Sequence, residues 1–203
     1  LDLYVTNWAN TVSQSFNRLY RNNADGSFSE VTQNAGVRDS SPRNSIAALW
    51  GDYDNDGDLD LYVVNFSRQD RLYRNNGNGA FSNVTGSAGV NVITQGSETA
   101  AAWGDYDSDG DLDLYLCKYY FQNTLYNNNG DGSFSEVAQT DGVADIRDSE
   151  DATWGDYDND GDLDLYVTNR EQNNALYQNN GSRKFTEVAC ALSLDNTDVG
   201  RSA

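Results

Sequence analysis

The sequence predicts an all-β protein made of β-propeller blades, each a sheet of four antiparallel strands. Three observations support this prediction. A unit of about 50 residues occurs four times in the 203-residue chain. Each unit contains four short segments of strand character, and no segment has the 3.6-residue periodicity of an amphipathic helix. A sandwich would not repeat its side chains at matching positions, and a parallel β-helix would have a much shorter period.

Two sequence strings define the repeat. The first, Trp-Gly-Asp-Tyr-Asp, occurs at spacings of 53 and 51 residues and begins at Trp50, Trp103 and Trp154. The second, Leu-Tyr-x-Asn-Asn, begins at Leu19, Leu72, Leu125 and Leu176. Each copy of the second string is followed by Phe-Ser-x-Val or Phe-Thr-x-Val. We therefore treat the chain as one repeat region, residues 1–203, with units at about 1–49, 50–102, 103–153 and 154–203.

The expected strands follow one another in the same order in each unit. In the copy around Trp50, residues 46–51 form a short apolar run, and an Asp-rich loop comes next. Residues 59–64 alternate between apolar and polar with period two, and residues 71–75 and 81–85 supply two further short segments. Four strands per unit are the content of one propeller blade.

A tight turn is expected between the last two strands of each unit. Asp25-Gly26 and Asp131-Gly132 carry the Asp-Gly signal of such a hairpin, whose glycine accepts a positive φ. In the fourth copy Arg183 stands where the other copies have glycine. We predict that this turn either differs from the others or bears backbone strain.

The composition excludes several kinds of site and partner. With 13 Lys and Arg against 32 Asp and Glu, the net charge is −19, so the surface repels nucleic acid and anionic lipid. The chain has no histidine, and Cys117 and Cys190 are too few for a thiolate metal cage. No apolar run is long enough to enter a membrane as a spanning helix. Carboxylate chemistry and cation binding remain.

An Asp-rich loop follows the first strand in three units. Each loop has aspartate at positions one, three, five, seven and nine and glycine at position six. The loop aspartates are Asp52, Asp54, Asp56, Asp58 and Asp60, then Asp105, Asp107, Asp109, Asp111 and Asp113, then Asp156, Asp158, Asp160, Asp162 and Asp164. Alternating carboxylates on a sharply turning backbone suit Ca²⁺, which takes about six to eight oxygen ligands. Magnesium fits less well, because it keeps several of its waters.

The positions have different expected roles. By analogy with the EF-hand, positions one, three and five offer side-chain oxygens and position seven its backbone carbonyl. Position twelve, where an EF-hand has glutamate, is apolar here, so position nine is expected to close the shell. Five like charges within nine residues repel strongly without a counter-ion, which favours a metal role over a merely solubilising one.

The chain begins part-way through a fourth loop. Leu1 aligns with position eight and Asp2 with position nine, so we expect three complete calcium sites and one partial site at the N-terminus. Since the chain also lacks methionine, we expect a processed product or a piece of a longer protein. Three arrangements stay open: part of a larger propeller, a closed four-bladed ring, or one segment of a polymer whose chains complete each other's blades.

These motifs resemble the FG-GAP/VCBS repeats of integrin-α-like β-propellers, and most closely the CRTAC/ASPIC-type subgroup. The resemblance rests on the loops, Leu-Tyr-Arg-Asn-Asn, the glycine turn, Phe-Ser-x-Val and Ala-Gly-Val, and it covers essentially the whole chain. It implies four-stranded blades with Ca²⁺ in the loop between the first two strands, and an extracellular or cell-surface setting. It also implies adhesion, ligand binding or scaffolding, with carbohydrate-active lyases and lectins as a minority.

The repeated Trp and Tyr residues could stack on sugars, but residues that recur in every unit are more readily explained as packing between blades. Because the loop aspartates already have a metal role, we expect no catalytic activity. The leading hypothesis is a secreted, calcium-binding β-propeller that acts as an adhesion or binding scaffold for a protein or glycan ligand at the cell surface, with calcium in a structural role. One alternative is a subunit of an extracellular fibre that self-associates through incomplete blades. Another is a carbohydrate-binding or polysaccharide-lyase propeller.

Overall fold

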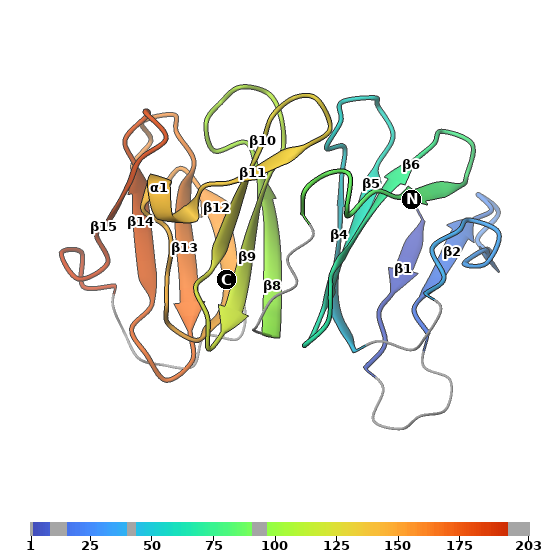
Figure 1. Cartoon of the computed structure of the whole chain (residues 1–203), viewed down its shortest axis with the longest axis horizontal. Coiled ribbons are helices and arrows are strands. Elements are labelled where there is room, and N and C mark those ends of the chain that lie inside the picture. Colours follow the sequence, from blue (N-terminus) through green and yellow to red (C-terminus); the bar gives the residue numbers. More distant parts are fainter. Residues whose placement is uncertain (1, 9–15, 40–43, 91–96, 195–203) are drawn as a thin grey trace.

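The strands form four separate antiparallel sheets that stand side by side in chain order (Figure 1). The computed structural model describes residues 2–8, 16–39, 44–90 and 97–194. We call the sheets blades 1 to 4. The predicted class of blade-like, four-stranded repeats is therefore confirmed, and within the described residues the blades do not close into a ring.

Among the described residues, blade 1 has three strands and the other blades have four. Blade 1 contains β1 (Leu3–Val5), β2 (Arg18–Asn22) and β3 (Phe28–Glu30). Blade 2 contains β4 (Ser45–Gly51), β5 (Asp60–Asn65), β6 (Arg71–Asn75) and β7 (Phe81–Asn83). Blade 3 contains β8 (Ser97–Gly104), β9 (Asp113–Tyr119), β10 (Thr124–Asn128) and β11 (Phe134–Glu136). Blade 4 contains β12 (Ser149–Gly155), β13 (Asp164–Asn169), β14 (Ala175–Asn179) and β15 (Phe185–Glu187). Each repeat tryptophan lies inside the first strand of its sheet, so the sheets begin before the residues at which the sequence units are counted.

The ends of the strands have identifiable causes. The segment expected at 81–85 ends as a strand at Asn83, because the Asn83 side chain accepts hydrogen bonds from the backbone N–H and hydroxyl of Thr85. The Thr85 hydroxyl in turn accepts the backbone N–H of Leu72, in place of a ladder carbonyl. In the last hairpin Arg183 adopts a φ of 57°, in the left-handed region that Gly26, Gly79 and Gly132 occupy in the other blades. The expected backbone strain is therefore present.

The fold contains a short helix that the sequence did not predict. This one-turn helix, α1 (Ala138–Asp141), follows β11 and is capped by Gly142, whose φ is 92°. Four residues are too few to produce a helical periodicity in the sequence. None of the helical residues in the described part of the chain forms a helix long and apolar enough to cross a membrane.

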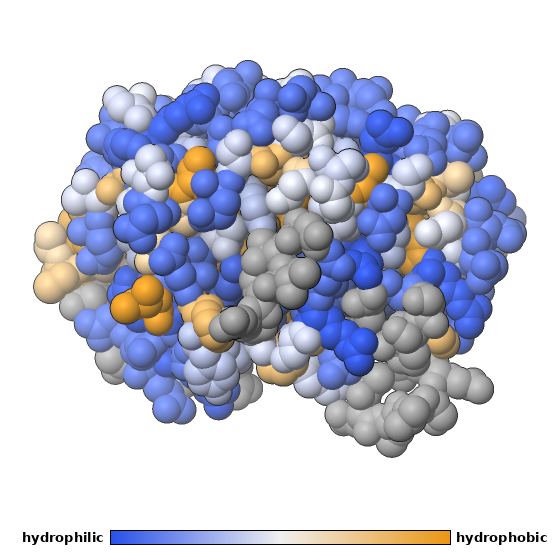
Figure 2. Space-filling view, viewed as in Figure 1, coloured by the Kyte–Doolittle hydropathy of each residue, from blue (hydrophilic) through white to orange (hydrophobic). Residues whose placement is uncertain are grey.

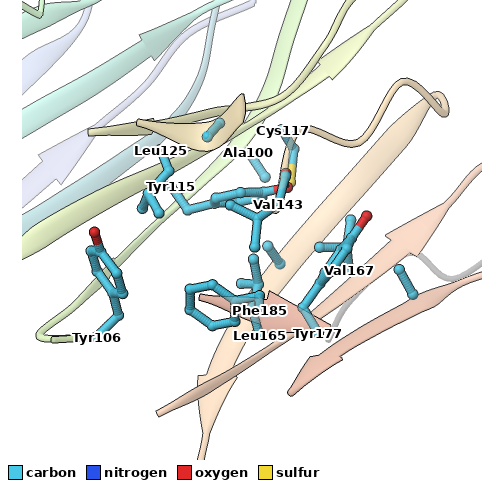
Figure 3. Packing of buried hydrophobic residues seen from close by; sticks show 13 residues of the cluster. Ala100, Tyr106, Tyr115, Cys117, Leu125, Val143, Leu165, Val167, Tyr177 and Phe185 are labelled. Atoms are coloured by element: carbon cyan, nitrogen blue, oxygen red, sulfur yellow. The ribbon is translucent and has the colours of Figure 1, made fainter. Parts of the chain in front are cut away.

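The hydrophobic core lies between the blades. One cluster of buried side chains joins each pair of neighbouring blades, and Figure 3 shows the cluster between blades 3 and 4, where Tyr115 faces Leu165 and Phe185. Every residue of β5 is buried, because Leu61 and Val63 pack towards blade 1 while Tyr62 and Val64 pack towards blade 3. The sheets therefore stabilise one another through both of their faces.

The repeat tryptophan packs against the glycine of the preceding blade. A Cβ added to Gly51 would lie 3.0 Å from the Trp103 ring, and one added to Gly104 would lie 2.6 Å from the Trp154 ring. Trp103 and Trp154 also contact Tyr62 and Tyr115 edge to face, at centroid distances of 6.0 and 6.2 Å. These contacts support the interpretation of the aromatic residues as packing between blades.

A polar triad bridges blades 1 and 2, and another bridges blades 3 and 4, at the end opposite the Asp-rich loops. Between blades 1 and 2, the Asn17 amide donates to Ser45, whose hydroxyl donates to Asn65. Between blades 3 and 4, the side chains of Asn123, Ser149 and Asn169 repeat this arrangement. Both triads are neutral and buried, so they satisfy their hydrogen bonds without placing charge in the interior.

The middle interface carries a charged triad instead. Asp70, Glu98 and Lys118 stand at the positions of Asn, Ser and Asn, with exposed fractions of 4%, 2% and 4%. Burial and the nearby Glu98 carboxylate raise the pKa of Asp70 to about 8, although the Asn65 backbone N–H and the Tyr62 hydroxyl donate to it. Burial lowers the pKa of Lys118. This triad contains two acids and one base, whereas the triads of the other two interfaces are neutral.

We predict that Gly104→Ala destabilises the protein by about 1–3 kcal/mol, because the new methyl group must displace the Trp154 ring. Gly155→Ala is the matched control, since the same position in blade 4 has no heavy atom within 4 Å of an added Cβ among the described residues. Urea unfolding of both variants measures the difference. Equal loss of stability in the two variants would contradict this role of the glycine.

We predict that Asp70→Asn makes the protein less sensitive to pH. The pKa of about 8 in the folded state lies above the value of about 3.9 expected when unfolded, so the folded state holds a proton that the unfolded state releases. The free energy of unfolding therefore falls as the pH rises from about 4 to about 8, and the variant lacks this fall.

Thermal unfolding of the wild type and the variant at several pH values measures the effect. Asn123→Asp, at the same position of the next interface, should introduce a similar pH dependence. The Asn side chain can be accommodated at position 70, because Asn123 already donates to the equivalent Tyr115 hydroxyl at 3.0 Å. A pH dependence identical in wild type and Asp70→Asn would show that this carboxyl is not responsible.

Candidate metal centre

The three Asp-rich loops lie at one edge of the molecule. They connect β4 to β5, β8 to β9 and β12 to β13, along the upper edge in Figure 1, beside the hairpin turns. The same edge is hydrophilic in Figure 2. Each loop leaves the first strand, at the edge of its sheet, and returns along the second strand, so its two ends are held by ladder hydrogen bonds.

Positions one, three and nine of each loop converge. One carboxylate oxygen from each of these three residues lies within 4.8 Å of the others. The three clusters are Asp52, Asp54 and Asp60; Asp105, Asp107 and Asp113; and Asp156, Asp158 and Asp164. We call them the first, middle and third clusters. Each could hold a metal ion between its carboxylates.

The aspartate at position nine is a structural anchor as well as a cluster member. The two oxygens of Asp60 accept the backbone N–H groups of Asn75, at 2.7 Å, and Tyr53, at 3.1 Å. Asp113 and Asp164 make the same pair of bonds in their blades. This carboxylate thus joins the start of its own loop to the third strand.

The loop backbone is turned by hydrogen bonds from positions one and five. The Asp52 carboxylate accepts the N–H groups of Asp56 and Gly57, and the Asp56 carboxylate accepts the N–H of Asp58. Gly57, at position six, has a φ of 92°, which glycine adopts without a steric penalty. Position five is therefore engaged with its own backbone and is not among the three converging carboxylates.

Position seven lies against the last hairpin of its own blade. A Cβ added to Gly77 would lie 2.8 Å from the Asp58 carboxylate, and the hairpin glycines of the next two blades lie equally close to Asp111 and Asp162. Asp111 also accepts the side-chain N–H of Asn55 from the preceding loop at 2.6 Å. The structure thus brings position seven into contacts between loops, which the sequence analysis did not anticipate.

Asp2 keeps one part of the pattern. Its carboxylate accepts the backbone N–H of Asn22 at 2.9 Å, as Asp60 does with Asn75 in blade 2. Among the described residues, Asp2 does not belong to a cluster of acidic side chains that could hold a metal ion. It therefore occupies the position expected of it, as the ninth residue of a loop.

The electrostatics of the clusters fit a cation. Burial raises the pKa of Asp60 to about 7 and that of Asp113 to about 8, and neighbouring carboxylates add to both effects. The Asp54 Oδ1 atom is buried, with no hydrogen-bond partner among the described residues. An oxygen without a donor, beside two further carboxylates, suits a hard divalent cation that binds oxygen ligands.

The repeat matches a known protein family. The model of the FG-GAP-like repeat matches residues 1–63, 52–116, 118–167 and 156–201, which together cover nearly the whole chain. The chain belongs to the FG-GAP-like repeat family. No curated protein sequence matches this FG-GAP-like chain.

Two solved structures are similar to most of this chain. An Agrocybe aegerita lectin, described for its recognition of non-reducing terminal N-acetylglucosamine, is 17% identical, with a TM-score of 0.48 over 92% of this chain. BBS1N, solved in complex with ARL6DN, is 14% identical, with a TM-score of 0.44 over 91% of this chain. The FG-GAP-like chain spans about half the length of each, 51% and 53% respectively.

We predict that positions nine and three of a loop respond differently to neutralisation. Asp60→Asn replaces an acceptor of two backbone N–H groups, so it should lower the free energy of unfolding by about 1–3 kcal/mol even in a chelator. Asp54→Asn should have little effect in a chelator, because its Oδ1 has no hydrogen-bond partner among the described residues. Urea unfolding in EGTA measures both. Equal destabilisation would contradict the separate roles.

Proposed function

We propose that this chain is a calcium-stabilised segment of an extracellular β-propeller that acts as an adhesion or ligand-binding scaffold without catalytic activity. The supporting observation is the threefold recurrence of converging carboxylates at positions one, three and nine. Calcium would be held by these residues, and it would supply the positive charge that three close carboxylates lack. Position five would contribute a side-chain oxygen and position seven its backbone carbonyl, as expected from the sequence pattern.

The proposed role of calcium is to stabilise the fold. Position nine links each loop to the third strand, so a cation at the cluster would tie the first, second and third strands of one blade together. Calcium sites of extracellular modules have dissociation constants of about 10⁻⁴–10⁻³ M, so a stabilising site of this kind would be filled in the proposed extracellular setting.

A ligand surface is available at the opposite edge of the blades. Tyr119, Tyr120, Asp148, Arg170 and Glu171 line a hollow of about 270 Å³, in which Tyr120 is 77% exposed. The guanidinium of Arg170 lies 5.9 Å from the centre of the Tyr119 ring. Aromatic rings beside charged hydrogen-bonding groups suit a glycan. A glycan array with Tyr120→Ala as the comparison tests this surface, and unchanged binding by the variant would exclude it.

A fibre subunit is the second candidate, favoured by the edge of blade 1. Within the described residues β1 is an edge strand of a three-stranded sheet, and Leu3 and Phe28 are exposed. A strand from another copy could pair along the open edge of β1. Light scattering decides the matter, since a monodisperse monomer at high concentration would exclude the fibre.

We predict that calcium raises the Tm by about 5 °C or more, because a ligand that binds only the folded state stabilises it by mass action. A variant with Asp54→Asn, Asp107→Asn and Asp158→Asn is the control and should lose this response. Thermal unfolding with calcium and with EGTA measures the shift, with magnesium as a second cation. Identical melting curves in calcium and EGTA would overturn the proposed role of calcium.

A further inference from the structure

A positively charged side chain of the protein itself contacts the middle cluster. Arg183, in the turn between β14 and β15, places its guanidinium 2.8 Å from the Asp107 carboxylate and 3.4 Å from that of Asp109. The side chain of Asp107 is 0% exposed and that of Arg183 is 49% exposed. Asp107 is the position-three member of the middle cluster. An arginine of blade 4 thus covers a candidate calcium ligand of blade 3.

The contact depends on the order of the blades. The hairpin of one blade lies beside the loop of the preceding blade, because the Asn179 amide donates to the backbone carbonyl of Tyr106 at 2.8 Å. Asn128 makes the same bond to Tyr53 one blade earlier. The hairpin that contains Arg183 therefore lies beside the loop of blade 3, and the equivalent hairpin of blade 3 lies beside the loop of blade 2.

Only one of these turns carries a cation. Gly132 stands at the position of Arg183 in the hairpin beside the first cluster, and Gly26 and Gly79 stand there in the other two. Arg74 lies near Asp54 in the first cluster and tends to lower its pKa, but the described residues include no ion pair between the two within 4.0 Å. The first and middle clusters therefore have equivalent carboxylates, but among the described residues only the middle cluster forms an ion pair with an arginine.

The turn itself does not require arginine. Its left-handed backbone, with φ at 57°, favours glycine, and three of the four units have glycine at this position. Arginine here carries an unfavourable backbone conformation, which leaves its contact with the loop as the interaction that the side chain adds. A guanidinium is permanently charged and binds carboxylates well, so it can neutralise Asp107 without a metal.

We propose that Arg183 is an internal counter-ion of the middle cluster that competes with the divalent cation for Asp107. This inference rests on the proposed calcium role. When calcium is low, Arg183 holds the Asp107 carboxylate. When calcium binds, the guanidinium must leave Asp107, so the middle site binds calcium more weakly than the first. Filling of the middle site would then release a positive side chain at the loop edge of the molecule.

The test is calcium titration by calorimetry in a background of Asp54→Asn and Asp158→Asn, which leaves the middle cluster intact. Arg183→Gln removes the charge, keeps most of the side-chain length and leaves the backbone strain in place. We expect its calcium affinity to be about fivefold higher, the size of effect expected for one partly exposed ion pair. The difference should shrink in about 0.5 M salt, because salt screens exposed charges.

Lys184→Gln is the matched control. Lys184 is adjacent in the chain, but its ammonium group pairs with Asp141 at 2.8 Å instead of the loop, so its neutralisation should leave the affinity unchanged. Equal increases for both variants would show a general charge effect and overturn the competition. An unchanged affinity in Arg183→Gln, with calcium still bound, would overturn this inference alone.

Two further measurements keep the outcomes distinct. If the background variant does not fold, the same comparison is made in the wild-type sequence, where Arg183→Gln should lower the calcium concentration needed for the last part of the Tm rise. If the wild type itself binds no calcium, the proposed function and this inference both fail. Binding by the wild type with no change of the calcium midpoint in the variant contradicts only the competition.

Discussion

The buried carboxylate at position nine of each loop is the constraint on which the other features of a blade depend. Asp60, Asp113 and Asp164 each accept two backbone N–H groups, one from the start of the loop and one from the third strand. These bonds fix the loop to the sheet, but they also hold a negative charge away from water. A buried negative charge is unfavourable without a counter-ion. A cation bound at position nine would also contact the carboxylates at positions one and three, which converge there.

The contacts between blades explain why the same residues recur in each unit. Each blade is too thin to have a core of its own, so its apolar side chains are buried only against the next blade. Gly51 and Gly104 leave room for the rings of Trp103 and Trp154, and two neutral polar triads join neighbouring sheets at their opposite ends. Stability is therefore built from nearest-neighbour interfaces, as in other repeat proteins.

The interfaces are nevertheless not equivalent. The middle one contains Asp70, Glu98 and Lys118 in place of neutral side chains, and the turn at Arg183 brings a fixed positive charge to the middle cluster. Both the charged triad and Arg183 lie in blades that keep the four-strand arrangement of the repeat. Side-chain substitutions between repeats thus alter the charge at one interface while the strands, turns and loop connections stay the same.

The sequence by itself determined the repeat, the order of strands in a blade, the glycine turns and the loops as the acidic sites, because these depend on local spacing and on side-chain type. It also identified Arg183 as an exception in its turn. Only the tertiary structure decided which carboxylates converge, since positions five and seven are drawn to backbone N–H groups and to a neighbouring hairpin. The charged triad and the Arg183–Asp107 pair were equally hidden, because their partners lie on different blades and meet only when the sheets pack together.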